Sequence, residues 1–89
     1  MEFEIGQVVI SKAGRDKGYV FIVIDVRGEY LQLVDGKGRP YANPKLKKIK
    51  HVQPTKTIDA DIKATLTLKQ VKDSDFRAAI KRFSGDREE

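Results

Sequence analysis

A short stretch near the start of the chain combines cationic side chains with glycines. Lys12, Arg15 and Lys17 fall within six residues, and Gly14 and Gly18 stand four positions apart among them. A lysine offers a point charge to a phosphate, whereas the arginine fork binds a phosphate bidentately or stacks on a base. Glycine tolerates positive φ and lets the backbone pass close to another chain. These residue types predict a loop that lies along a phosphate backbone.

A second basic segment spans residues 36–56 and contains no acidic residue. Its candidate phosphate and base contacts are Lys37, Arg39, Tyr41, Lys45, Lys47, Lys48, Lys50 and His51. An aromatic ring flanked by cations can stack an unpaired base. Two alternatives stay open from the sequence. Lysines on an edge strand also prevent aggregation, and Tyr41 also fits a role in covering one end of the domain.

The net charge of +5 is concentrated in the first part of the chain. Residues 1–57 contain 11 basic and 6 acidic side chains, whereas residues 58–89 contain 7 of each. A positive field of this kind attracts polyanions, among which RNA is the first expectation and an anionic membrane surface a weaker one.

Residues suited to catalysis or to metal binding are scarce. His51 is the only histidine and there is no cysteine, so histidine clusters, thiolate metal sites and disulfides are excluded. Asp35 precedes Gly36 and is typical of a turn, and Asp25 can accept hydrogen bonds from the turn that follows it. We therefore expect no enzymatic activity, no cofactor and no metal.

The same composition indicates a compartment. The sequence has no apolar run near the roughly 18 residues that a membrane span needs, and its acidic start is unlike a signal peptide. The lack of cysteine suits a reducing environment. We expect a cytoplasmic protein that does not bind membranes and is monomeric when free.

The elements that position these residues are strands in the first half of the chain. β-Branched and aromatic residues between glycine turns predict strands at residues 6–11, 19–27, 30–34 and 47–52, with turns at 27–29 and 35–36. The second strand is apolar on both faces. Such a strand is covered on both sides or bends around a small barrel.

Helices are expected after Pro54. A helix at 59–68, capped by Asp59, competes with a strand-like alternation over the same residues. A second helix begins with Asp73 or Ser74 as its cap and ends before Gly85. Its apolar residues recur at helical spacing: Phe76, Ala79, Ile80 and Phe83.

Several motifs in residues 6–37 occur together: Gly6-Gln7-Val8-Val9, Ser11 with Gly14 and Gly18, Ile22-Val23-Ile24-Asp25-Val26 and Leu33-Val34-Asp35-Gly36. This combination resembles the KOW-type domain of large-subunit ribosomal proteins. The group is the archaeal and eukaryotic one numbered fourteen, six and twenty-seven, with small bacterial relatives described as KOW-domain RNA-binding proteins. Phe21 stands where the KOW domains of elongation factors have a glycine, which favours the ribosomal branch.

The resemblance implies an SH3-like β-barrel that contacts RNA through the loop around Gly14 to Gly18. With it, we expect a mainly β protein with C-terminal α structure. Residues 1–55 form the barrel, residues 56–85 a short helical extension packed on it, and residues 86–89 a tail.

The predicted function is an RNA-binding module associated with the ribosome. It would recognise structured ribosomal RNA of the large subunit through phosphate and shape, with ribosomal proteins as further partners. The alternative is a protein-interaction adaptor that uses the barrel or the stripe of Phe76, Ile80 and Phe83. Binding that persists in high salt favours the adaptor, because salt screens exposed charges.

Overall fold

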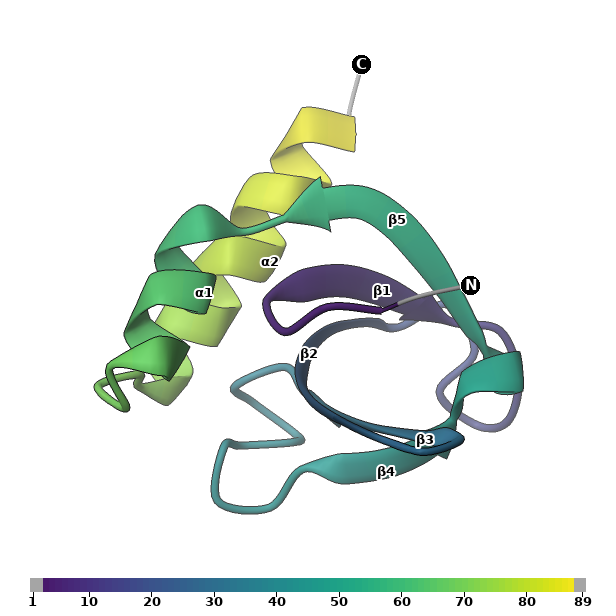
Figure 1. Ribbon diagram of the computed structural model, residues 1–89. Helices are drawn as coiled ribbons and strands as arrows, with labels where there is room; N and C mark the ends of the chain where they lie inside the picture. Colours follow the sequence, from purple (N-terminus) through teal and green to yellow (C-terminus); the bar gives the residue numbers. More distant parts are fainter. Residues whose placement is uncertain (1–2, 88–89) are drawn as a thin grey trace.

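The protein is a mainly β structure followed by two helices (Figure 1). The computed structural model describes residues 3–87. Five antiparallel strands form one sheet in the order β4-β3-β2-β1-β5. The elements are β1 (Gln7–Ser11), β2 (Val20–Arg27), β3 (Tyr30–Val34), β4 (Lys45–Lys48), β5 (Val52–Ile58), α1 (Ala60–Thr67) and α2 (Asp73–Arg87).

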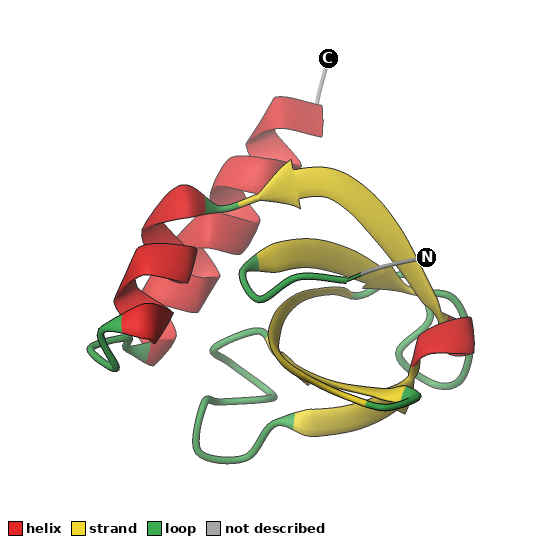
Figure 2. Ribbon diagram, viewed as in Figure 1, coloured by secondary structure: helices red, strands yellow, loops and turns green. Residues whose placement is uncertain are grey.

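The sheet is strongly curled and encloses one of two hydrophobic cores (Figure 2). Val9, Phe21 and Val23 point to the inside of the curl, where Leu31, Leu33 and Val52 also lie. Alternate side chains of a strand point to opposite faces, so Val8 and Ile22 point outwards, towards the helices. Of the two alternatives that the apolar pattern of the second strand predicted, cover on both faces is the one observed, since its residues belong to both cores. The sheet is not closed, because β4 and β5 remain its two edges.

The second core lies between the sheet and the helices. Val8, Ile22 and Val34 supply the sheet side. The helix side is built from Ile62 of α1 and from Phe76, Ala79 and Phe83 of α2. The apolar stripe predicted for the last helix is therefore confirmed, and it is used to pack the helix onto the sheet.

The predicted strand at 47–52 is wrong, because the chain turns in the middle of it. β4 ends at Lys48, a 3-10 turn covers Ile49–His51, and β5 begins at Val52. This turn carries the chain from one edge of the sheet to the other, next to β1. β5 was not predicted because it contains Pro54, and an edge strand is the place in a sheet that tolerates proline. It also crosses the expected boundary after residue 55.

The first helix is confirmed where it was expected. Asp59 is its N-cap, with Oδ1 accepting the N–H of Ile62 at 3.0 Å. The hydroxyl groups of Thr65 and Thr67 donate to carbonyls of the preceding turn. These hydrogen bonds give the threonine hydroxyl groups partners within the helix, although threonine is a residue type that makes a helix less expected.

The second helix continues further than predicted. It begins at Asp73 and runs through Gly85 to Arg87, because one helical glycine costs only about 1 kcal/mol and does not by itself end a helix. The expected tail therefore starts as helix at residues 86–87, and residues 88–89 lie outside the described residues. Within residues 3–87, neither helix has the length and apolar character that crossing a membrane requires.

Gly36 is one of the points at which the β3–β4 connection touches α2. It has φ +76, and a Cβ there would lie 2.3 Å from the carbonyl oxygen of Asp73. Arg77 donates from Nη1 to the carbonyl oxygen of Gly36, which closes the contact from the helix side. Only glycine lets the two backbones come this close.

Replacing Gly36 with alanine is expected to lower the free energy of unfolding by about 2 kcal/mol, from positive-φ strain plus the clash with a backbone atom. Chemical denaturation measures it. Gly28→Ala is the matched control: its φ is +59 and nothing lies within 4 Å of its Cβ position, so it should cost about 1 kcal/mol. Equal costs for the two variants would contradict the close contact with α2.

Candidate nucleic-acid interface

The β1–β2 loop presents its three cations to solvent. Lys12, Arg15 and Lys17 are exposed, and none of the ion pairs formed within residues 3–87 involves them. Gly14 and Gly18 have φ +85 and +90, in the region that glycine accepts without strain. The predicted need for glycine at both positions is confirmed, and the loop carries uncompensated positive charge.

The only acidic residue of this loop points inwards. Asp16 is 7% exposed and accepts a hydrogen bond from the Ser11 hydroxyl at 2.7 Å. Its two carboxylate oxygens form ion pairs with Lys45 at 2.8 Å and Lys47 at 3.1 Å. Asp16 thus neutralises lysines of β4 and leaves the cations of its own loop unpaired.

The pKa of Asp16 reflects this environment. Burial alone raises the pKa of a carboxyl group. The hydrogen bonds from Lys45, Ser11 and Lys47 outweigh that effect and hold the pKa of Asp16 well below its ordinary value of 3.8. The carboxylate is therefore charged throughout the neutral range and holds the loop onto β4.

The loop and the second basic segment lie next to each other. The Lys12 N–H donates to the carbonyl oxygen of His51 at 2.8 Å, and the Lys47 ammonium donates to the carbonyl oxygen of Ala13 at 3.0 Å. The structure thus brings together two regions that the sequence placed more than 30 positions apart. Lys45 and Lys47 were predicted to contact RNA, and their immediate role is to hold the loop.

The remaining basic residues of β4 and the following turn, Lys48, Lys50 and His51, have different surroundings. The Lys48 ammonium lies 5.9 Å from the centre of the Tyr30 ring. Lys50 is exposed and lines a shallow hollow with Lys12 and Phe3. His51 is half-buried. Of this cluster, Lys50 is the cation that most directly extends the charge of the loop.

Tyr41 packs against the second helix. Its ring stacks on Phe76 with the ring centres 5.9 Å apart, and its N–H donates to Asp73 Oδ1 at 2.7 Å. The same carboxylate was predicted as a helix cap. This packing agrees with the alternative that Tyr41 covers part of the core, and base stacking by Tyr41 stays a prediction.

Asp35 holds the β3–β4 connection. Its Oδ1 accepts the N–H groups of Lys37 at 2.9 Å and Arg39 at 2.8 Å, so the predicted turn role of Asp35 is confirmed. Lys37 is exposed and Arg39 is half-buried. The turn presents both cations on the same side of the molecule as Tyr19, because Tyr19 lines hollows with each of them.

Comparison with protein-family models gave no match, and neither did comparison with curated protein sequences.

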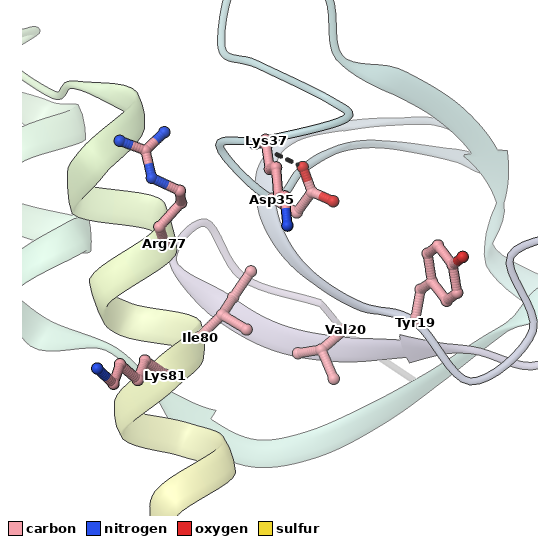
Figure 3. Close-up of a pocket in the computed structure, with 7 residues that line it drawn as sticks. All are labelled: Tyr19, Val20, Asp35, Lys37, Arg77, Ile80 and Lys81. Atoms are coloured by element: carbon pink, nitrogen blue, oxygen red, sulfur yellow. Dashed lines mark hydrogen bonds between the residues drawn. The ribbon is translucent and has the colours of Figure 1, made fainter.

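Three residues that lie beside the candidate interface were not predicted to belong to it. Tyr19 was expected in the core or on the sheet surface and not as a platform for a base; 60% of it is exposed, which agrees with the surface position. Arg77 and Lys81 of α2 line the same hollow as Tyr19 (Figure 3). The sequence shows Arg77 and Lys81 four positions apart on one helix face, but not that this face lies opposite the end of the β1–β2 loop.

Proposed function

We propose that this protein is an RNA-binding module that associates with structured ribosomal RNA, mainly through phosphate and shape contacts. The contacts are made first by Lys12, Arg15 and Lys17 of the β1–β2 loop, with Lys50 beside them. Lys37 and Arg39 extend the surface from the β3–β4 connection.

The arrangement of charges in the β1–β2 loop is the main support for this proposal. The loop has three exposed cations, and its single carboxylate is turned into the protein against Ser11, Lys45 and Lys47. A merely soluble loop would be expected to pair its acidic and basic residues at the surface, where each pair contributes little. Here the contacts of the buried carboxylate fix the loop to the rest of the protein, while its three cations remain exposed and free to bind a ligand. Such an arrangement favours a ligand that carries regularly spaced negative charge.

The proposed family is the ribosomal KOW group, with an SH3-like barrel. The curled antiparallel sheet, the glycine-bearing loop between β1 and β2, and the Asp35-Gly36 turn after β3 support it. In this proposal the barrel is open between β4 and β5, and the two helices pack on its outside. The ligand is then RNA of the large ribosomal subunit, in the cytoplasm.

Replacing Lys12, Arg15 and Lys17 together with alanine is expected to weaken binding to large-subunit ribosomal RNA about 100-fold, at about 1 kcal/mol for each lost phosphate contact. The slope of log affinity against log salt should fall by up to about 3. Filter binding across a salt series measures both. For the wild type, roughly six to ten phosphate contacts would reduce affinity by about 10³ to 10⁵ between about 50 and 200 mM salt.

The matched control removes three other lysines, Lys63, Lys69 and Lys72. They lie on α1 and on the connection to α2, on the opposite side of the molecule from the loop (Figure 1). This variant has the same net charge as the loop variant. If both variants lose affinity equally, or if the loop variant binds RNA unchanged while folded, the loop is not the binding site.

The adaptor alternative is less well supported. Phe76 is fully buried and Phe83 is 8% exposed, so most of the helical stripe that would dock a partner already packs on the sheet. What remains is the curled sheet itself. Binding to ribosomes that is insensitive to salt would favour the adaptor over RNA contact.

A further inference from the structure

A groove separates the second helix from the start of β2. It has a volume of about 480 Å³, within the range of about 300–1,000 Å³ typical of small-molecule sites. Tyr19 forms one side, Ile80 and Arg77 of α2 form the other, and Val20 lies at the bottom (Figure 3). No residue predicted to bind RNA, other than Lys37, lines it.

We infer that this groove binds one unpaired nucleotide of an RNA strand, with its base against Tyr19 and its phosphate beside Lys37 and Arg77. The inference rests on the proposed RNA-binding function and extends it from paired RNA to an unpaired position. It also assigns a role to α2, which the family resemblance leaves without one.

The walls of the groove match a nucleobase. Tyr19 is 60% exposed, and no ring within residues 3–87 stacks on it, so its face is open to a base. Val20 and Ile80 are half-buried and supply an apolar floor that a flat ring can cover. A base stacked on an aromatic side chain contributes about 1–3 kcal/mol.

The rim of the groove matches a phosphate. The Lys37 side chain extends into the space between Tyr19 and α2 (Figure 3). Arg77 uses Nη1 for the Gly36 carbonyl oxygen and thereby holds its guanidinium at the edge of the groove. Lys81 lies one helical turn further and also lines the groove, but its ammonium group points away from it (Figure 3). Two cations, Lys37 and Arg77, thus lie at the edge of an apolar floor.

The one acidic residue that lines the groove is Asp35. Its Oδ1 accepts two backbone N–H groups, which offset part of its charge. Its Oδ2 accepts no hydrogen bond from residues 3–87 and provides an acceptor for the exocyclic amino group of a base. The chemistry thus suits a base that carries an amino group, such as adenine.

The groove continues into the proposed interface. A smaller hollow of about 160 Å³ shares Tyr19 and Asp35 with it and is also lined by Arg39 and Lys45. Tyr19 directly follows Gly18, the last residue of the basic loop. A strand whose paired part lies on the loop can therefore place its next, unpaired nucleotide in the groove without leaving the positive surface.

The test compares two RNA probes: a fully paired hairpin, and the same hairpin with a short run of unpaired adenosines at one end. We expect the wild-type protein to bind the extended probe about tenfold more tightly, from one base stacked on Tyr19. Tyr19→Ala should remove this gain and leave affinity for the paired hairpin unchanged. Tyr19→Phe, which keeps the ring, should retain the gain.

One further variant sharpens the test. Tyr30→Ala is the matched aromatic control, because Tyr30 is partly exposed at the β2–β3 turn, away from the groove, and should leave the gain intact.

Equal wild-type affinity for the two probes, or a gain that survives Tyr19→Ala, would overturn the inference. The proposed function would still be supported by binding to the paired hairpin. Binding of neither probe would overturn both. Adenosine monophosphate is the remaining probe. If it bound as tightly as the extended RNA, the groove would be a free-nucleotide site and its assignment to an RNA strand would be wrong.

Discussion

Phe76→Ala is expected to lower the free energy of unfolding by about 3–5 kcal/mol, the range for truncating a fully buried phenylalanine. Phe76 is 0% exposed and lies in the core between the sheet and the helices. It also supports Tyr41, whose ring stacks on it. The variant therefore leaves a cavity at the point where α2, the sheet and the β3–β4 connection meet.

This loss is a large part of the stability expected for a small domain, which is about 5–15 kcal/mol in total. Chemical denaturation followed by circular dichroism measures it. Leu68→Ala is the control, because Leu68 is 64% exposed at the end of α1 and should change stability by less than about 0.5 kcal/mol. A cost below about 1 kcal/mol for Phe76→Ala would contradict the packing of α2 on the sheet.

Asp16→Asn is expected to lower the free energy of unfolding by about 3 kcal/mol, the lower end of the range for breaking a buried ion pair. The amide keeps the shape of the side chain but leaves the Lys45 and Lys47 ammonium groups without their counter-charge. We take the lower end because 28% of the Lys45 side chain is exposed, and solvent screens that part of the interaction.

The pH dependence of this effect has a definite direction. The folded protein holds the pKa of Asp16 well below 3.8, whereas the unfolded chain has the ordinary value. Below about pH 4 the unfolded chain therefore binds a proton that the folded protein does not, and the stabilisation by Asp16 decreases as the pH falls. Above that pH it is fully present. The difference in stability between wild type and Asp16→Asn should be constant near neutral pH and shrink in acid.

Urea denaturation between about pH 7 and pH 2.5 tests both statements. Asp25→Asn is the matched control, since Asp25 pairs with Arg27 at the surface, where both side chains are more than a third exposed. It should cost less than about 1 kcal/mol at neutral pH. A cost for Asp16→Asn no larger than that of Asp25→Asn would show that the buried cluster does not hold the loop.

Much of the fold follows from local sequence signals. The three strands β1 to β3 and the Gly28 turn are confirmed because β-branched runs and glycine turns act over a few residues. The cap of α1 and the apolar stripe of α2 are confirmed for the same reason. The strand expected at 47–52 is wrong because the chain leaves one edge of the sheet after Lys48 and joins the other edge at Val52, and no local pattern encodes such a change of edge.

For the candidate site as well, some features follow from the sequence alone and others depend on the tertiary structure. Composition and spacing alone locate the positive charge: three cations in a glycine-bearing loop, and a segment from 36 to 56 with no acid. Only the tertiary structure decides which of these charges are free. It turns Asp16 inwards onto Lys45 and Lys47, and it brings α2 opposite Tyr19 to form the groove. The physical reason is that charge is a property of each residue, whereas burial and pairing depend on contacts between distant parts of the chain.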